Sequence, residues 1–218
     1  LGTGVSLIAI ILSMLVVAGL KWSHLAKVAV AVAAVGMVFI VSAPHRIERV
    51  MTFIQGDNNS QVVEDSNYHI AQARIAIGSG GLFGLGIGNS VQATGYLPEA
   101  INDSIFAIMG ETFGFVGLVA ILVLFSALLL SLINVASRLA DMRLRLVVAG
   151  VFGWVGSHVI LNVAAMTGVA PLTGIPLPLL SYGGTSMLFI AAALGLAFQL
   201  SRYTSHKPLE GGEGSGQD

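Results

Sequence analysis

The sequence predicts an all-α, polytopic membrane protein with about five transmembrane helices and a long extracytoplasmic loop in its 218 residues. Hydrophobic residues make up 55% of the chain, charged residues only 10%, and the mean hydropathy is +0.87. Soluble domains carry roughly 25% charged residues, so this composition excludes an ordinary soluble domain. A net charge of −1 gives no field that would attract nucleic acid, and the lack of cysteine excludes disulfides and thiolate chemistry.

Five apolar segments approach the roughly 20 residues that a helix needs to cross a bilayer. They comprise residues 5–20, 27–43, 115–137, 146–167 and 186–203. Residues 104–113 form an apolar lead-in to the third segment, interrupted by Gly110, Glu111 and Gly114. No charged leader or cleavage site precedes the first segment, so it is not predicted to be a signal peptide. We expect instead that the chain is the second part of a longer protein.

Basic residues fall in the loops on one side of these segments. They are Lys21, Lys27, Arg138, Arg143, Arg145, Arg202 and Lys207. Cytoplasmic loops of membrane proteins carry an excess of such residues, so this side is predicted to be cytoplasmic. The loop of residues 44–103 then faces outward, and residues 1–204 form one transmembrane domain. Residues 205–218 are rich in Gly, Glu and Ser and are predicted to form a disordered cytoplasmic tail.

The outward loop contains two predicted helices. Within residues 46–55, Ile47, Val50, Met51 and Ile54 recur with helical spacing, which predicts an amphipathic helix in the membrane interface. A second short helix is predicted over residues 66–77 and stops at Gly78. This second helix carries a set of hydrogen-bonding side chains that is unusual for an interfacial segment: Tyr68, His69, Gln72 and Arg74.

Residues 78–88 contain six glycines in eleven positions. The run matches neither the dinucleotide-binding fingerprint nor the phosphate loop of nucleotide-binding proteins. One interpretation is a flexible or re-entrant turn. The other is a loop whose backbone N–H groups, at Gly80 and Gly81, approach an anionic ligand closely. Together with Arg46, Arg49 and Arg74, such a loop would suit a lipid pyrophosphate.

Three carboxylates follow the glycine run. Asp103 precedes Ser104 at the start of an apolar run, so the local sequence favours a helix N-cap there over a general base. Glu111 lies eight residues later within apolar sequence, where an acid is by default a candidate functional residue. Glu99 follows Pro98 and is interpreted as a solvated loop acid, which we keep as a candidate substrate contact.

Other polar residues lie in the fourth segment and beyond it. Trp154, His158 and Asn162 recur every four residues, so they share one helix face and are predicted to bond neighbouring helices rather than to act in catalysis. The five histidines lack the spacing of metal ligands. Residues 171–186 hold three prolines and three glycines, and such irregular backbone is tolerated in a membrane only when it packs in protein or lines a cavity.

Several of these residues together resemble the SEDS family of bacterial membrane proteins. The C-terminal part of the pattern is Asn162, Gly168, Pro171, Gly174, Pro176 and residues 181–186, SYGGTS. The middle part is residues 76–84 (AIGSGGLFG), 96–99 (YLPE), 103–107 (DSIFA) and 110–111 (GE), and residues 1–3 (LGT) resemble the end of a further family motif. The resemblance covers nearly the whole chain except the tail and corresponds to the second half of a protein with about ten spans.

The resemblance implies a peptidoglycan glycosyltransferase in the bacterial cytoplasmic (inner) membrane that polymerises lipid II, the undecaprenyl-pyrophosphate-linked disaccharide. It implies as partners a class B penicillin-binding protein, other division proteins and membrane lipid. Residues 88–92 (GNSVQ) resemble the division members of the family more than the elongation members. The chain departs from the family pattern at residues 101–104 (INDS), at residues 111–114 (ETFG) and at Leu85, where lysine is common.

By resemblance, Asp103 occupies the position of the catalytic acid of the family. It would accept the proton of the acceptor sugar 4-hydroxyl as that oxygen attacks the donor anomeric carbon, with inversion. The residues expected to bind substrate are Arg46, Arg49, Tyr68, Gln72, Arg74, Gly80, Gly81, Glu99, Glu111, Ser181, Gly183 and Gly184. No residue is assigned to a metal, although a divalent cation would serve as a further countercharge to the pyrophosphate.

Two other functions remain open at this point. One is a lipid II flippase or transporter of lipid-linked precursors, and the other is a non-catalytic scaffold for division proteins. A transporter predicts polar residues along the spans, whereas a transferase predicts polar residues at one face of the membrane. The polar residues gather in the outward loop, and the spans hold little beyond His158, Asn162 and Glu111, which favours the transferase.

Overall fold

The structure, a computed structural model, describes residues 2–41, 61–90 and 102–203. Every regular element in these ranges is an α-helix, which confirms the predicted all-α class. The helices are α1 (Gly2–Val17), α2 (Trp22–Val41), α4 (Gln61–Ser79), α5 (Ile105–Arg138), α6 (Met142–Met166) and α7 (Gly184–Ser201). The predicted helix over residues 66–77 lies within α4, whereas the predicted helix over residues 46–55 and the predicted tail of residues 205–218 lie outside the described residues.

Three helices of the described chain are long and apolar enough to cross a membrane, namely α5, α6 and α7. Apolar side chains on the outer face of α5 are largely exposed, for example Leu124 at 70% and Leu130 at 65%, as expected for a surface that contacts lipid. Helix α1 is apolar, but its 16 residues rise only about 24 Å, less than the roughly 30 Å of a hydrocarbon core. The membrane protein is therefore polytopic, but the predicted number of five spans is not confirmed.

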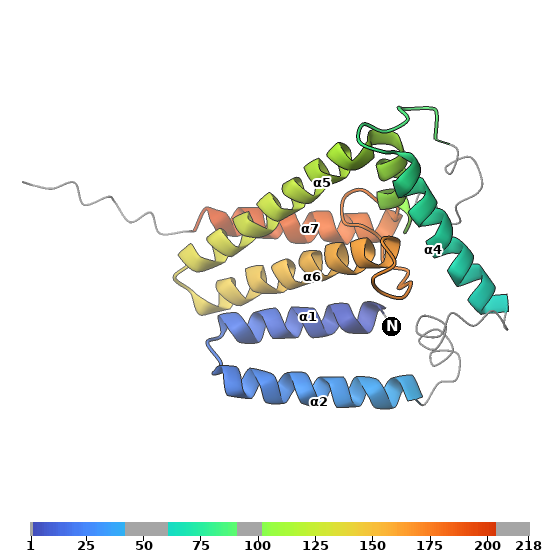
Figure 1. Cartoon of the computed structure of the whole chain (residues 1–218). Helices are drawn as coiled ribbons and strands as arrows, with labels where there is room; N and C mark the ends of the chain where they lie inside the picture. Colours follow the sequence, from blue (N-terminus) through green and yellow to red (C-terminus); the bar gives the residue numbers. More distant parts are fainter. Residues whose placement is uncertain (1, 42–60, 91–101, 204–218) are drawn as a thin grey trace, which may run out of the picture.

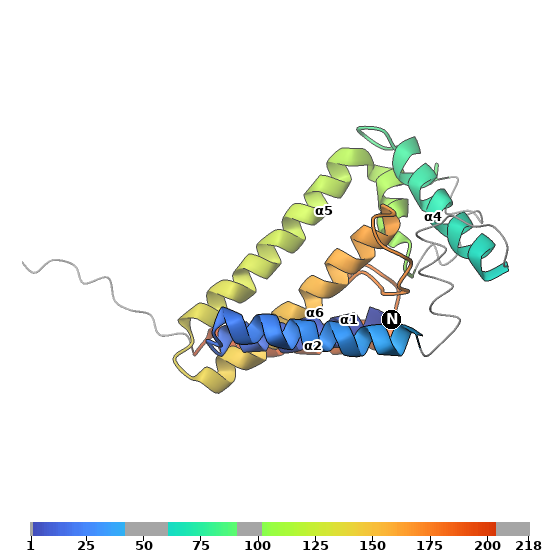
Figure 2. The ribbon, with the colours of Figure 1, turned by 60° about the horizontal axis from the view of Figure 1, so that its bottom comes forward.

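Helix α6 lies at the centre of the bundle and contacts α1, α5 and α7 (Figure 1). Small residues allow the close approach of α1: the Ser13 hydroxyl donates to the Ala149 carbonyl at 2.7 Å, and a Cβ added to Gly153 would lie 2.3 Å from the same hydroxyl. Membrane helices associate mainly through such van der Waals contacts and interhelical hydrogen bonds. The α1–α6 pair thus forms one wall of the molecule, against which α2 packs through α1 (Figure 2).

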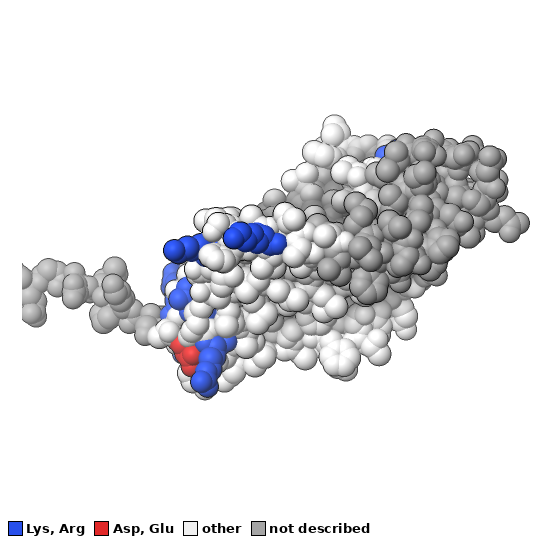
Figure 3. All heavy atoms as spheres, turned by 90° about the horizontal axis from the view of Figure 1, so that it is seen from below, with Lys and Arg blue, Asp and Glu red and all other residues white. Residues whose placement is uncertain are grey.

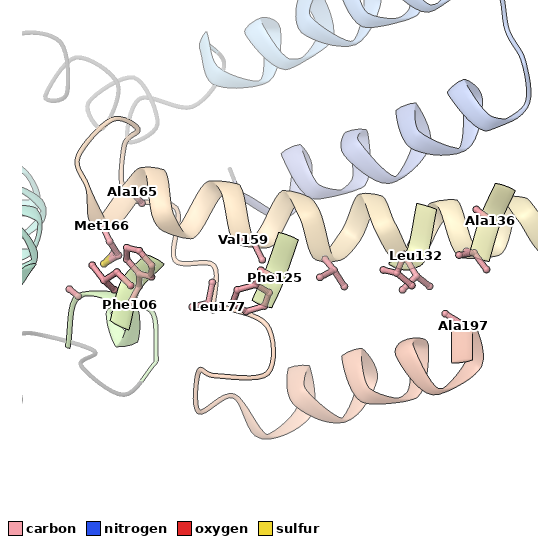
Figure 4. Packing of buried hydrophobic residues seen from close by; sticks show 14 of the residues in the cluster. Phe106, Phe125, Leu132, Ala136, Val159, Ala165, Met166, Leu177 and Ala197 are labelled. Carbon is pink, nitrogen blue, oxygen red and sulfur yellow. The ribbon is translucent and has the colours of Figure 1, made fainter. Parts of the chain in front are cut away.

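The buried core follows the line where α5, α6 and α7 meet (Figure 4). Phe125 of α5 lies beside Val159 of α6, Leu132 lies farther along the same line, and Ala197 of α7 lies near Leu132 and Ala136. At the other end of this line, Phe106 packs near Met166, and both are at most 2% exposed. The core therefore continues into the region where α5 begins and α6 ends.

The two ends of the bundle differ in charge and in backbone regularity. Lysines and arginines gather at one end, here called the basic end, where short turns join α1 to α2 and α5 to α6 (Figure 3). The described members of this group are Lys21, Lys27, Arg138, Arg143, Arg145 and Arg202. The opposite end carries α4, the glycine-rich loop after it, the turn of residues 102–104 and the irregular segment between α6 and α7 (Figure 1).

Candidate functional site

Helix α5 is broken at Gly114, whose φ of 68° and ψ of −168° are accessible almost only to glycine. A break frees backbone groups that a membrane cannot hydrate, so they need partners within the protein. The glycine-rich loop supplies these partners by pairing with α5 on both sides of the break. The bonds are Leu85 N to Glu111 O (2.9 Å), Gly86 N to Thr112 O (3.1 Å), Phe115 N to Gly81 O (2.8 Å) and Val116 N to Leu82 O (3.1 Å).

The glycines of the loop allow this pairing because the two backbones nearly touch. A Cβ added to Gly80 would lie 2.0 Å from the Gly110 carbonyl oxygen, and one added to Gly84 would lie 2.2 Å from that of Thr112. The backbone N–H groups of Leu85 and Gly86 are taken by α5. This arrangement favours the re-entrant turn over the anion-binding loop. The assignment of Gly80 and Gly81 to substrate binding stays a prediction.

Glu111 is enclosed beneath this loop. Its side chain is 1% exposed, and the Ser90 hydroxyl donates to its Oε2 at 2.5 Å. A carboxylate so enclosed can contact a substrate only if the loop moves away from α5. The prediction that Glu111 binds substrate therefore stays a prediction, and the described geometry gives Glu111 a place in the packing of the break.

Asp103 lies in the turn that leads into α5. The N-cap of the helix is Ser104, so the prediction of Asp103 as N-cap is wrong by one residue. The Ser104 hydroxyl makes no cap hydrogen bond, which would contribute about 0.5–2 kcal/mol to helix stability. It lies instead 3.0 Å from Nε2 of His69 on α4, and both side chains are buried, with exposures of 0% and 5%.

Asn162 holds the same turn from α6. Its side-chain amide donates to the carbonyl oxygens of Asp103 and Ile175, each at 2.8 Å, and the residue is 1% exposed. This face of α6 is predicted to bond neighbouring helices; Asn162 does bond across the bundle, but to a turn and to an irregular segment rather than to helices. Trp154 donates instead to Nε2 of His158 within α6, at 3.0 Å. One buried amide thus ties the turn before α5 to the segment after α6.

The irregular segment after α6 passes close to the Asp103 carboxylate at Gly174. Gly174 has a φ of +65°, and a Cβ added there would lie 3.5 Å from Asp103 Oδ2. Asp103 itself is half-buried. The Ser181 hydroxyl, proposed from the sequence to bind substrate, accepts from the Leu177 N–H at 2.7 Å and so shapes this segment. Gly183 and Gly184, the other predicted contacts here, are the N-cap and the first residue of α7.

Arg74, on the exposed side of α4, lies at the C-terminal end of α6. Its Nε donates to the Thr167 carbonyl at 3.2 Å and its Nη2 to the Gly168 carbonyl at 3.1 Å. A cation at this end also suits the helix dipole. Arg74 therefore joins α4 to α6. The neighbouring candidates Tyr68, 45% exposed, and Gln72, half-buried, also lie on α4. Arg46, Arg49 and Glu99 lie outside the described residues.

The described part of the chain therefore brings together Asp103, Ser104, His69, Asn162 and Gly174. Within the described ranges no group of three or more His, Asp or Glu side chains is placed to hold a metal ion. A half-buried carboxylate on a turn that buried side chains hold suits a general base, because a base must be held in a defined position. Sequence reasoning named His69 and Asn162 but did not connect them to Asp103. The one available signal was helical spacing, which puts His69 on the same face of α4 as the buried residues Ala73 and Ala76.

Comparison with known proteins gives matches over almost the whole chain. The FtsW/RodA/SpoVE family model, described as "Cell cycle protein", matches residues 1–206. Stage V sporulation protein E of Bacillus subtilis is 37% identical over 206 residues, which cover 94% of this chain and 56% of that protein. A probable peptidoglycan glycosyltransferase FtsW of Thioalkalivibrio sulfidiphilus is 37% identical over 207 residues, covering 93% and 51%. A probable peptidoglycan glycosyltransferase FtsW of Mycobacterium tuberculosis is 39% identical over 208 residues, which cover 95% of this chain and 38% of that protein.

A solved structure is also similar. One chain of a peptidoglycan synthase complex, studied for the structural coordination of polymerization and crosslinking, superimposes with a TM-score of 0.69 at 27% identity. The match covers 93% of this chain and 55% of that chain. The chain thus spans about half the length of the first relatives that it matches.

Proposed function

Because the chain belongs to the FtsW/RodA/SpoVE family of cell cycle proteins, we propose that this protein is a peptidoglycan glycosyltransferase that polymerises lipid II into glycan strands during bacterial cell division. Relatives that carry the name peptidoglycan glycosyltransferase support the reaction class. The observation that carries the proposal is the Asp103 carboxylate, half-buried beside Gly174 on a turn whose backbone Asn162 holds.

In this proposal Asp103 is the general base. Its carboxylate accepts the proton of the acceptor sugar 4-hydroxyl while that oxygen forms a bond to the donor anomeric carbon. The bond from this carbon to the pyrophosphate breaks on the opposite side, undecaprenyl pyrophosphate leaves, and the configuration inverts. A positioned base contributes roughly 10²–10⁴ in rate. Orientation of the two sugars and neutralisation of the pyrophosphate supply the rest.

Arginines at the same end of the protein are proposed to bind the pyrophosphate. Arg74 uses Nε and Nη2 for the carbonyls of Thr167 and Gly168, and its guanidinium has further N–H donors. Arg46 and Arg49 are assigned to this role from the sequence alone. Tyr68, Gln72 and Glu99 are proposed to contact the sugars, and a divalent cation would act as an additional countercharge.

We propose that the basic end of the bundle faces the cytoplasm and that the Asp103 end faces outward from the bacterial cytoplasmic membrane. The gathering of Lys and Arg at the basic end supports this orientation (Figure 3). Since the chain has no cysteine, a single cysteine at Asn89 should react with an impermeant maleimide in spheroplasts, and one at Ser137 only after lysis. The opposite labelling pattern would overturn the orientation.

A class B penicillin-binding protein, together with other division proteins, is the proposed partner. The similar solved chain belongs to a peptidoglycan synthase complex, which supports such an assembly. The complete gene product should co-purify with this partner in mild detergent. Failure to co-purify, with both proteins folded, would argue against the partnership.

The test of the function is glycan chain formation from lipid II by the complete gene product with its partner. Wild type should polymerise lipid II, and Asp103→Asn should lose roughly 10²-fold or more of the rate, because asparagine keeps the shape but cannot accept the proton. Lipid II translocation without polymerisation by the wild type would favour the flippase. Absence of both activities in a folded complex would favour the scaffold.

A further inference from the structure

A buried histidine–serine pair adjoins Asp103 in the described structure. Ser104 follows Asp103 directly, is 0% exposed, and its Oγ lies 3.0 Å from Nε2 of His69. Ser104 is the N-cap of α5, but its hydroxyl makes no cap hydrogen bond to that helix. The hydroxyl contacts His69 on α4 instead. An N-cap serine usually bonds the backbone of its own helix. The bond of Ser104 to a distant side chain instead indicates that His69 holds the turn in place.

His69 is well placed to act as a fixed support. The face of α4 that carries it also carries Ala73 and Ala76, both 0% exposed, and this face packs against α5. The C-terminal end of α4 is held by Gly80, whose backbone lies directly against Gly110 of α5. A side chain that projects from a helix fixed in this way holds its partner more exactly than one projecting from a free loop.

The turn is therefore held at two consecutive residues by two different helices. Asn162 of α6 donates to the Asp103 carbonyl at 2.8 Å, and His69 of α4 shares a hydrogen bond with the Ser104 hydroxyl at 3.0 Å. One contact holds the carbonyl of the Asp103–Ser104 peptide and the other holds the Ser104 side chain, so the turn has little freedom to shift or rotate. The direction of the Asp103 side chain towards Gly174 follows from that backbone.

We propose that His69 is a positioning residue that sets the Asp103 carboxylate through its hydrogen bond with Ser104. This inference rests on the proposed glycosyl transfer by Asp103. His69 does not itself touch the sugars or take the proton in this scheme. Its contribution is geometric, and a misplacement of about 1 Å in a catalytic group can reduce the rate by roughly 10²-fold.

The experiment compares four variants of the complete gene product with its partner: Ser104→Ala, His69→Ala, the double variant and His69→Gln. Glycan formation is measured as kcat and KM for lipid II, with kcat expressed per folded molecule. Ser137→Ala is the matched control, because Ser137 also lies on α5 but donates to Asn134 of its own helix at the basic end. Asp103→Asn is measured in the same series.

We expect Ser104→Ala and His69→Ala each to lower kcat by roughly 10- to 100-fold while KM changes by less than about 3-fold. The double variant should be no worse than the poorer single variant, because both remove the same interaction. His69→Gln keeps a side-chain amide that can reach Ser104 and should recover most of the lost rate. Ser137→Ala should match wild type.

Three results would overturn the inference. Ser104→Ala with wild-type kcat, beside an inactive Asp103→Asn, would show that Asp103 acts without this support. Losses that multiply in the double variant would show that His69 and Ser104 act separately. A purely structural role would lower the amount of folded protein but leave kcat per folded molecule unchanged. If the wild type does not polymerise lipid II, the proposed function is wrong, and the inference, which depends on it, is wrong as well.

Discussion

Asp103, in the turn before α5, and Glu111, in the first segment of that helix, lie eight residues apart in the sequence, and the protein holds them in different ways. At Asp103 the backbone is fixed by Asn162, and the carboxylate is left half-buried. At Glu111 the carboxylate itself is bonded, by Ser90, and is 1% exposed beneath the glycine-rich loop. From this difference we propose that the half-buried Asp103 serves chemistry and that the enclosed Glu111 serves the packing of the broken helix.

The largest effect, on the yield of folded protein, is expected for the glycines that let the glycine-rich loop approach α5 above Glu111. Gly84→Ala places a Cβ 2.2 Å from the Thr112 carbonyl oxygen at a residue with a φ of +80°. Because both atoms belong to backbone, the clash can be relieved only by separating the loop from the break, which leaves backbone groups unpaired. We expect Gly84→Ala to prevent accumulation of folded protein, measured as monodisperse material in detergent.

The matched control for this variant is Gly195→Ala in α7. A Cβ at Gly195 would meet no atom within 4 Å. This substitution should leave the yield and stability close to those of wild type or raise them slightly, since alanine favours helix over glycine by about 1 kcal/mol. Equal behaviour of the two variants would refute the packing role assigned to the loop glycines.

The second prediction concerns the support of the Asp103 turn. Asn162→Asp keeps the side-chain shape but replaces the two N–H donors with an oxygen that faces the carbonyls of Asp103 and Ile175. Two buried carbonyls that lose their donor cost roughly 1–3 kcal/mol each. We expect a clear loss of thermal stability and a larger loss of glycan formation. Asn134→Asp, at an exposed site that bonds Arg138, should change both much less.

Much of the architecture follows from sequence, because hydropathy and helix breakers are local. Apolar runs predict the membrane helices, and Gly114 is one of three residues that the sequence shows interrupting the apolar run that becomes α5; the structure places the break at Gly114. The helix breakers of residues 171–186 predict an irregular segment that packs in protein or lines a cavity, and in the structure Gly174 of this segment lies close to the Asp103 carboxylate. The His69–Ser104 contact spans 35 positions and that of Asn162 with Asp103 spans 59, so no local pattern could reveal them.

The N-cap was missed for a related reason. Aspartate and serine both favour the N-cap, so the local sequence Asn102-Asp103-Ser104 does not fix where the helix begins. In the structure the N-cap is Ser104, one residue later than this pattern predicts. Likewise, the sequence indicates that Arg74 is a cation near the site, but its bonds to the end of α6 depend on how α4 lies across the bundle.

A smaller effect is expected at Ser90. Ser90→Ala removes the hydroxyl that donates to Glu111 Oε2. A hydrogen bond contributes about 0.5–1.5 kcal/mol net, so the variant should lower the melting temperature by a few degrees. Glycan formation per folded molecule should stay within about 3-fold of wild type, because the Asp103 turn is untouched. A large loss of rate without a loss of stability would place Glu111 in the chemistry and break the comparison.

The smallest expected effect on stability is at Arg74, whose two hydrogen bonds are exposed. Arg74→Lys keeps the charge but not the fork that reaches both Thr167 and Gly168, and should cost less than about 1 kcal/mol. Measuring KM and kcat of this variant with lipid II then tests whether Arg74 also contacts the pyrophosphate. An increase in KM with unchanged stability would support contact with the pyrophosphate, whereas unchanged KM and kcat would leave Arg74 only its structural role.

The most direct test measures activity and stability together for Asp103→Asn and Glu111→Gln in the complete gene product with its partner. Each substitution keeps the side-chain shape and removes one carboxylate. We predict that Asp103→Asn loses roughly 10²-fold or more in kcat with a melting temperature within about 2 °C of wild type. Glu111→Gln weakens the hydrogen bond with Ser90, and each kcal/mol lost should lower the melting temperature by about 2–4 °C. Its kcat per folded molecule should stay within about 3-fold of wild type. Wild-type polymerisation by Asp103→Asn, or a rate loss without a stability loss in Glu111→Gln, would contradict the account.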